Sequence, residues 1–259
     1  AANPVALGFD ILFVEPDRYS PPVLGRYLPQ LPGTTWNALP EPDQLLAAAL
    51  AKGPTVLALS GEYATALGVR NAVRGVPLAS RGGDPLEHLL QFPSVLASLP
   101  ALRATAAGEG IINGHLERDR YARERGVMRQ LPLAARIGDA VVPSLGLEML
   151  RLAQSAEHLA MVVGPDGLER IGSGDYTVPV LPNGEVVLHF EPWQGSRYVS
   201  ASQVLKGQVP AERLAERFVL VGLTGLGLQD QVVTPLGERI PGIDIHAQVI
   251  DSLLTGDVA

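Results

Sequence analysis

Three short runs of apolar residues constrain the fold of this chain more than any other feature. They read VALGFDILFV at residues 5–14, PTVLALS at 54–60 and RFVLVGL at 217–223, and all three are typical of buried β-strands. Between the first two runs, Asp43 and Gly53 frame the segment QLLAAALA as the N-cap and the C-terminal glycine of a short helix. The order strand, helix, strand predicts an α/β fold with a mixed, mostly parallel central sheet and helices on both faces.

The last third of the chain carries the clearest local signals. The run at 217–223 is almost continuously apolar, which predicts a central parallel strand. A glycine-rich loop follows it, and a helix is expected after Pro241 and Gly242, ending at Gly256. The residues expected on the apolar stripe of that helix are Ile243, Ala247, Ile250 and Leu254.

The middle of the chain predicts smaller elements. A helix is expected to open at Asp84-Pro85, and another after Pro143-Ser144. Short β runs separated by Gly, Asp and Pro turns occupy 161–190. We therefore expect a single domain over residues 1–259 with β-rich insertions around the central sheet.

Composition excludes several classes of protein. The 259 residues are 46% apolar and carry a net charge of −7, which argues against a disordered chain and against a nucleic-acid binder. No apolar run approaches the roughly 20 residues of a membrane helix. Cysteine is absent, so disulfides, thiol catalysis and cysteine-zinc sites are excluded. The chain starts almost directly in a strand-like run, which favours a piece of a longer protein.

Acidic residues form the first candidate site. Asp10, Glu15 and Asp17 lie in and just after the first apolar run, and Asp230 follows the last one. Together their carboxylates could form an oxygen-rich site for a divalent cation. They could equally be solvated residues, helix caps or partners of arginines. Because Asp10 interrupts an apolar strand, it must be hydrogen-bonded or paired, and structural bonding is the favoured interpretation over a metal.

Other catalytic patterns are weak. The glycine-rich loop around Thr224 matches neither a dinucleotide-binding motif nor a P-loop, and no G-x-S-x-G elbow is present. None of the five histidines is paired at metal-ligand spacing. His246 lies on or near the apolar face of the last helix, where it is either a core residue or a pocket residue facing Asp230.

Four segments resemble the CHASE type 2 family of sensor domains. The strongest is FVLVGLTGLGLQDQVVTPLGERIPGIDIHAQVIDSLLTGD at 218–257, and FDILFVEPDRYSP, GVMRQLPL and PSLGLEMLRL support it. In the closing segment, the matching positions are Gly222, Thr224, Gly227, Asp230, Thr234, Pro235, Gly237, Pro241, Gly242, His246 and Ala247. In the other segments, they are Asp10, Phe13, Glu15, Pro16, Asp17, Ser20, Pro21, Gly126, Arg129, Pro132, Leu133, Pro143, Ser144 and Glu148.

The resemblance implies a sensory module outside the bacterial inner membrane. Such domains are joined through membrane helices to adenylate cyclases, histidine kinases, serine/threonine kinases or cyclic-di-GMP enzymes. The domain itself is then no enzyme, although the full-length protein is expected to be one. We expect a small-molecule or ion signal, a homodimer, no nucleic-acid partner and no cofactor other than a candidate divalent cation. The candidate ligand-binding residues are Asp10, Glu15, Asp17, Thr224, Asp230, Thr234 and His246.

The chain departs from the family pattern in two places. It lacks an earlier strand with an acidic pair, so we expect a central sheet position that is empty or is filled by another segment or by a neighbouring molecule. Arg125-Gly126 replaces an acid-glycine pair, which puts a role for an acid there in doubt.

Two alternatives to a sensor stay open from the residues alone. One is a metal-dependent α/β hydrolase using Asp10, Glu15, Asp17 and Asp230, although no nucleophile and base lie at recognisable spacing. The other is a mechanical dimerisation module that binds no small molecule.

Overall fold

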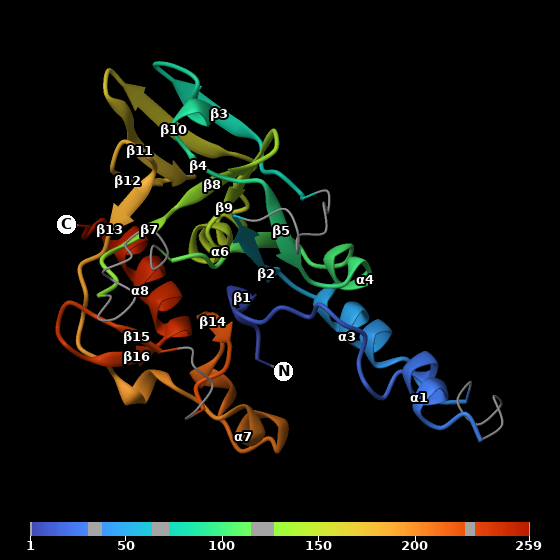
Figure 1. Ribbon diagram of the computed structural model, residues 1–259. Coiled ribbons are helices and arrows are strands. Elements are labelled where there is room, and N and C mark those ends of the chain that lie inside the picture. Colours follow the sequence, from blue (N-terminus) through green and yellow to red (C-terminus); the bar gives the residue numbers. More distant parts are fainter. Residues whose placement is uncertain (1, 31–37, 64–72, 115–126, 226–230, 259) are drawn as a thin grey trace.

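A five-stranded sheet forms the centre of the molecule (Figure 1). The computed structural model describes residues 2–30, 38–63, 73–114, 127–225 and 231–258. The strands of the central sheet are β1 (Ala6–Phe9), β2 (Thr55–Glu62), β5 (Ser94–Ala97), β6 (Gly108–Ile111) and β14 (Phe218–Val221). β14, β1, β2 and β6 are parallel neighbours in that order, and β5 pairs antiparallel with the second half of β2. The predicted mixed, mostly parallel sheet is confirmed, and its described strands leave no empty position between them.

Helices cover both faces of this sheet. On one face α6 (Leu145–Ala153) packs against β1, β2 and β6, and α8 (Gly242–Thr255) packs against α6. On the other face lie α3 (Pro42–Leu50) and α4 (Pro100–Arg103). Adjacent residues of β2 pack on opposite faces of the sheet. Val56 packs with α6, and its neighbour Leu57 packs with α3 and α4. Successive strand residues point to opposite faces, so a continuous apolar run serves two cores.

A β-rich region adjoins the same core. Its strands are β3 (Leu78–Arg81), β4 (Leu90–Phe92), β7 (Gln130–Pro132), β8 (Ala134–Ile137), β9 (Ala140–Pro143), β10 (Leu159–Gly164), β11 (Gly167–Ser173), β12 (Tyr176–Pro179), β13 (Glu185–Val187), β15 (Gln231–Val233) and β16 (Arg239–Pro241). They form the sheets β12-β11-β10-β3 and β4-β8-β9 and the pairs β13-β7 and β15-β16. The largest buried cluster joins most of these strands to Leu147 of α6 and Val249 of α8, while β4 packs in a separate cluster with residues of β5 and β8. The β-rich insertions are therefore present, and most of their strands share one core with the helices.

Short helical elements complete the fold. They are α1 (Pro21–Tyr27), α7 (Ala201–Leu205) and the 3₁₀ turns η1 (Pro85–Glu87), η3 (Gly195–Arg197) and η4 (Ala211–Arg213). None of the residues of α1 is buried, and in Figure 1 this helix extends away from the sheet beyond α3.

Two strand predictions need correction. The run at 5–14 leaves the sheet after Phe9, and Phe13 instead bonds to Ser98 and Leu99 beside β5. β14 is an edge strand rather than a central one, because among the described strands it pairs with β1 alone. Its apolar side chains pack against α8 and α6. The apolar run therefore reflects the helices that cover the sheet, and not a neighbouring strand on each side.

Three helix predictions also differ from the structure. The N-cap position of α3 is Glu41, whose side chain makes no capping hydrogen bond, rather than Asp43, whose carboxylate accepts a hydrogen bond from the backbone N–H of Asp17. At Asp84-Pro85 only the 3₁₀ turn η1 forms before β4 begins. The stripe predicted on α8 is partly wrong. Leu254 is 37% exposed, whereas Ile245, Val249 and Leu253 are buried.

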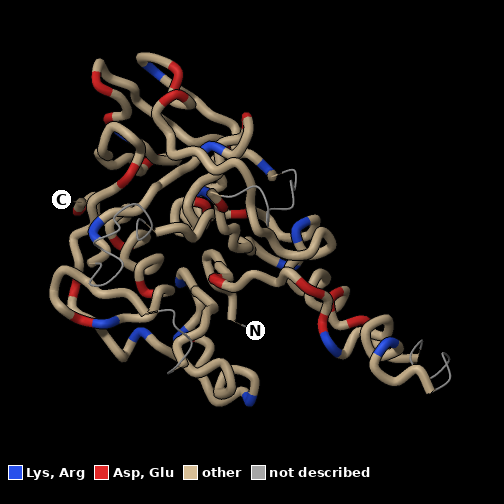
Figure 2. Tube along the Cα trace, in the orientation of Figure 1, with Lys and Arg blue, Asp and Glu red and all other residues tan. Residues whose placement is uncertain are grey.

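Charged residues are interspersed along the described chain, so the net charge is not concentrated in one segment (Figure 2). No helix in the described part of the chain is both long enough and apolar enough to span a membrane.

Candidate functional site

Asp10 occupies the point where β1 leaves the central sheet. Its backbone N–H donates a hydrogen bond to the carbonyl of Val221, the last residue of β14. Its side chain is only 9% exposed. The carboxyl group therefore lies buried at the carboxyl ends of two adjacent parallel strands, which is where α/β sheets bind ligands.

His246 approaches Asp10 from α8. The imidazole is buried, and its Nε2 lies 3.9 Å from Oδ1 of Asp10. This separation is longer than a hydrogen bond and becomes an ion pair only if the imidazole is protonated. The structure thus brings together two of the predicted residues from distant parts of the chain, and it does so across the junction between the sheet and α8.

Burial changes the proton affinity of this pair. Removal from water raises the pKa of Asp10 from its ordinary value of 3.8 to about 6. The carboxyl group therefore titrates about two pH units higher than a solvated aspartate does, near pH 6. A buried carboxyl with such a pKa beside a histidine is characteristic of functional sites, although structural pairs also show it.

Thr234 is buried in the turn between β15 and β16. Its backbone N–H donates to the carbonyl of Glu238, and the side chain is 1% exposed. The hydroxyl Oγ1 has no hydrogen-bond partner within the described residues. A buried unsatisfied hydroxyl costs about 1–3 kcal/mol and requires an explanation. Thr234 therefore stays a candidate ligand-binding residue.

The remaining candidate residues divide into those that the structure describes and Asp230, which it does not. Asp17 accepts a hydrogen bond from the backbone N–H of Tyr19 and shapes the turn before α1. Glu15 and Thr224 are exposed. Asp230 lies outside the described residues, as do Arg125 and Gly126. The described residues contain no group of three or more His, Asp or Glu that could hold a metal ion, and Asp230, the fourth member of the candidate cation site, lies outside them.

Two buried ion pairs near the central sheet were not predicted from the sequence. Glu148 of α6 is 1% exposed and binds Arg151 through two hydrogen bonds of 2.7 Å. Burial raises the pKa of Glu148, while the bond to Arg151 opposes that rise. On β6, Glu109 is likewise buried and binds Arg103. The spacing of Glu148 and Arg151, three residues apart in an apolar helix, was the signal for the first pair.

A polar network joins α8 to the segment that follows β13. Asp244 is buried and accepts hydrogen bonds from the Tyr198 hydroxyl at 3.1 Å and from the Gln248 amide at 3.3 Å. Gln248 also accepts the backbone N–H of Glu191. Burial, the largest cause, together with the neighbouring Asp244 raises the pKa of Tyr198 to about 12. These hydrogen bonds anchor the segment after β13 to α8.

Comparison with protein families identifies the chain. A family model described as a CHASE2 domain matches residues 1–259, the whole length given. This chain belongs to the CHASE2 family. CHASE2 domains are extracytoplasmic sensory domains of signalling receptors and are not themselves catalytic. Comparisons with curated proteins and with solved structures found no match.

Membership in the CHASE2 family decides between two of the earlier interpretations. It confirms the resemblance drawn from the four sequence segments, including the closing segment that contains His246. It also argues against the hydrolase alternative, because the CHASE2 domain is sensory and non-catalytic.

Proposed function

We propose that this CHASE2 domain is the ligand-input part of a bacterial inner-membrane receptor that signals by shifting between two conformations. Its output would be a nucleotide cyclase, a histidine kinase, a serine/threonine kinase or a cyclic-di-GMP enzyme. The observation that carries the proposal is the buried Asp10–His246 pair, which joins the ligand-binding edge of the sheet to α8. A signal that binds one arrangement of this pair more tightly would shift the population toward it.

The packing of α8 supports its role as the moving element. At Gly146 of α6 the two helices approach closely, since an added Cβ would lie 3.0 Å from Val249 and 3.3 Å from the carbonyl of His246. Closely packed helices shift as rigid bodies instead of deforming continuously. A change at His246 would therefore be carried along α8 toward its end at Thr255. In a homodimer, which we also propose, two such helices would move together.

A ligand screen on the isolated chain tests this function. Thermal unfolding is measured with metal ions and small metabolites on the parent protein, Asp10→Asn, His246→Gln and, as a control, Glu212→Gln, which replaces an exposed residue of η4. A ligand present at 100 times its Kd stabilises the folded state by about 2.7 kcal/mol, which raises Tm by several degrees. We expect the shift in the parent and the control and its loss in the two site variants.

Other outcomes of the screen contradict the proposal. A shift of equal size in all four proteins places the ligand elsewhere. The absence of any shift, together with a dimer in light scattering, favours the mechanical dimerisation module. A monomer at all concentrations contradicts the homodimer.

A further inference from the structure

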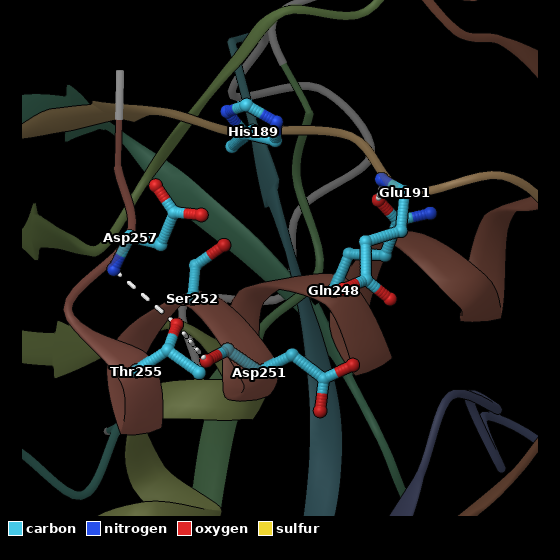
Figure 3. Close-up of a pocket in the computed structure, with 7 residues that line it drawn as sticks. All are labelled: His189, Glu191, Gln248, Asp251, Ser252, Thr255 and Asp257. Carbon is cyan, nitrogen blue, oxygen red and sulfur yellow. Dashed lines mark hydrogen bonds between the residues drawn. The ribbon is translucent and has the colours of Figure 1, made fainter.

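A polar pocket lies at the C-terminal half of α8, away from the Asp10–His246 pair. It has a volume of about 70 Å³ and opens between α8 and the segment that follows β13 (Figure 3). Ser252, on its floor, is six residues beyond His246, which corresponds to roughly 9 Å along the helix axis. The pocket is therefore a separate feature of the same helix.

A backbone bridge builds one wall of this pocket. Leu188 and Val258 pair as an isolated antiparallel bridge, and this pairing places their neighbours His189 and Asp257 beside each other. In Figure 3 the side chains of His189, Asp257 and Ser252 border the same space from three parts of the chain. The wall is thus positioned by hydrogen-bonded backbone instead of by flexible side chains alone.

The charge of the pocket favours a cation. Three carboxylates line it, from Glu191, Asp251 and Asp257. Arg197 compensates two of them, through bonds of 2.9 Å to Glu191 and 2.6 Å to Asp251. Asp257 forms no ion pair with any described residue. The C-terminal end of α8 adds the negative pole of its helix dipole at the same place.

The hydroxyl of Ser252 provides an independent indication of a ligand. Ser252 as a residue is 5% exposed, and its Oγ, which makes no hydrogen bond with any described residue, is open to the pocket. A buried serine in a helix ordinarily donates to the carbonyl one turn earlier. In Figure 3 this hydroxyl instead points into the pocket on the side of Asp257. A hydroxyl that faces the pocket and has no protein partner can accept a hydrogen bond from a ligand donor.

The donor set distinguishes an organic cation from a metal ion. Within the described ranges no three carboxylates or histidines approach closely enough to ligate a metal. An ammonium group instead needs separate acceptors for its three N–H donors, and Ser252 Oγ and the Asp257 carboxylate provide them on adjacent sides. A cavity of this volume holds several water molecules, so it has room for an ammonium group on a short carbon chain.

We propose that this pocket binds a small primary ammonium ion, with Asp257 as its counter-charge and Ser252 Oγ as a hydrogen-bond acceptor. Occupation would tie the last turn of α8 to the segment after β13. The site goes beyond the proposed function, because binding here does not require the Asp10–His246 pair to detect a signal.

Ethylammonium chloride is the probe that tests the proposal. Binding is followed by amide chemical shifts in ¹H–¹⁵N NMR spectra, at constant ionic strength. A ligand of three heavy atoms gains at most about 1.5 kcal/mol per atom, so Kd is expected in the range of about 1–10 mM. We expect saturable shifts near Ser252 and Gly256, a roughly tenfold weaker Kd for Asp257→Asn and a several-fold weaker Kd for Ser252→Ala.

Matched controls separate this site from alternatives. Asp166→Asn removes an exposed acid in the turn between β10 and β11, and it should leave Kd unchanged. His246→Gln should also bind normally, which distinguishes failure of this site from failure of the proposed function. Thermal unfolding of each variant confirms that it folds. Equal binding of ethanol, a stronger response to Mg²⁺, shifts that do not saturate, or variants of Ser252 and Asp257 that bind like the parent would each overturn the proposal.

Discussion

Replacing Asp10 by Asn tests whether burial of its carboxylate lowers the stability of the folded protein at high pH. Asn has nearly the same shape as Asp but carries no charge at any pH. The pKa of Asp10 is about 6 in the folded protein and 3.8 in its ordinary, solvated state. The folded state therefore binds this proton more tightly than the unfolded state does.

The sign and size of the effect follow from that difference. Stability contributed by Asp10 is fully present below pH 3.8 and is lost as the pH rises to about 6, because the ionised carboxylate must then be buried. A difference of about two pKa units corresponds to about 3 kcal/mol. At pH 8, Asp10→Asn should accordingly be more stable than the parent by up to about 3 kcal/mol, and near pH 4 the difference should vanish.

Urea unfolding at a series of pH values between 4 and 8 measures this prediction. The free energies of unfolding of the parent and the variant are subtracted at each pH, so the titration of groups common to both proteins cancels. The exposed Glu15→Gln serves as the matched control and should show no pH-dependent difference. A difference independent of pH would refute the reasoning. So would an Asn variant that is less stable at pH 8, because His246 would then hold the ionised carboxylate as an ion pair.

Two further substitutions test the packing around the central sheet. Arg151→Ala should lower the free energy of unfolding by about 3–5 kcal/mol, since it leaves Glu148 buried without a partner, and the double variant with Glu148→Leu should recover part of that loss in urea titrations. Gly110→Ala should lower Tm strongly, at a cost of about 3 kcal/mol or more, because its Cβ would lie 2.5 Å from the Cα of Leu145. Gly53→Ala, with nothing within 4 Å, is the control and should change Tm little. A Gly110 variant as stable as the Gly53 variant would contradict the close approach of β6 and α6.

Local sequence signals predicted several elements correctly. The apolar run at 54–60 became β2, and Ser144 caps α6 by accepting the backbone N–H of Leu147. α8 ends at Gly256, whose φ of 71° is the left-handed conformation expected of a terminating glycine. These features depend on residues within a few positions of one another, so the sequence is sufficient to predict them.

The candidate site was predictable in part. Asp10 was identifiable because it interrupts an apolar strand, and His246 because it lies in the helix after the glycine-rich loop. That the two side chains meet depends on the pairing of β1 with β14 and on the packing of α8 over the sheet. Glu15 and Asp17 looked equivalent to Asp10 in sequence. The chain turns away after Phe9, however, and leaves Glu15 exposed and Asp17 in the turn before α1.

The amino-acid sequence alone therefore determined the class of fold, the start of α6, the end of α8 and the membership of the chain in a sensory family. Only the tertiary structure decided that β14 is an edge strand, that Asp10 faces His246, and that Ser252 and Asp257 share a pocket. The physical reason is the range of the interactions. Propensity and capping act through neighbouring backbone groups, whereas burial, ion pairs and pockets arise where distant segments come into contact and exclude water.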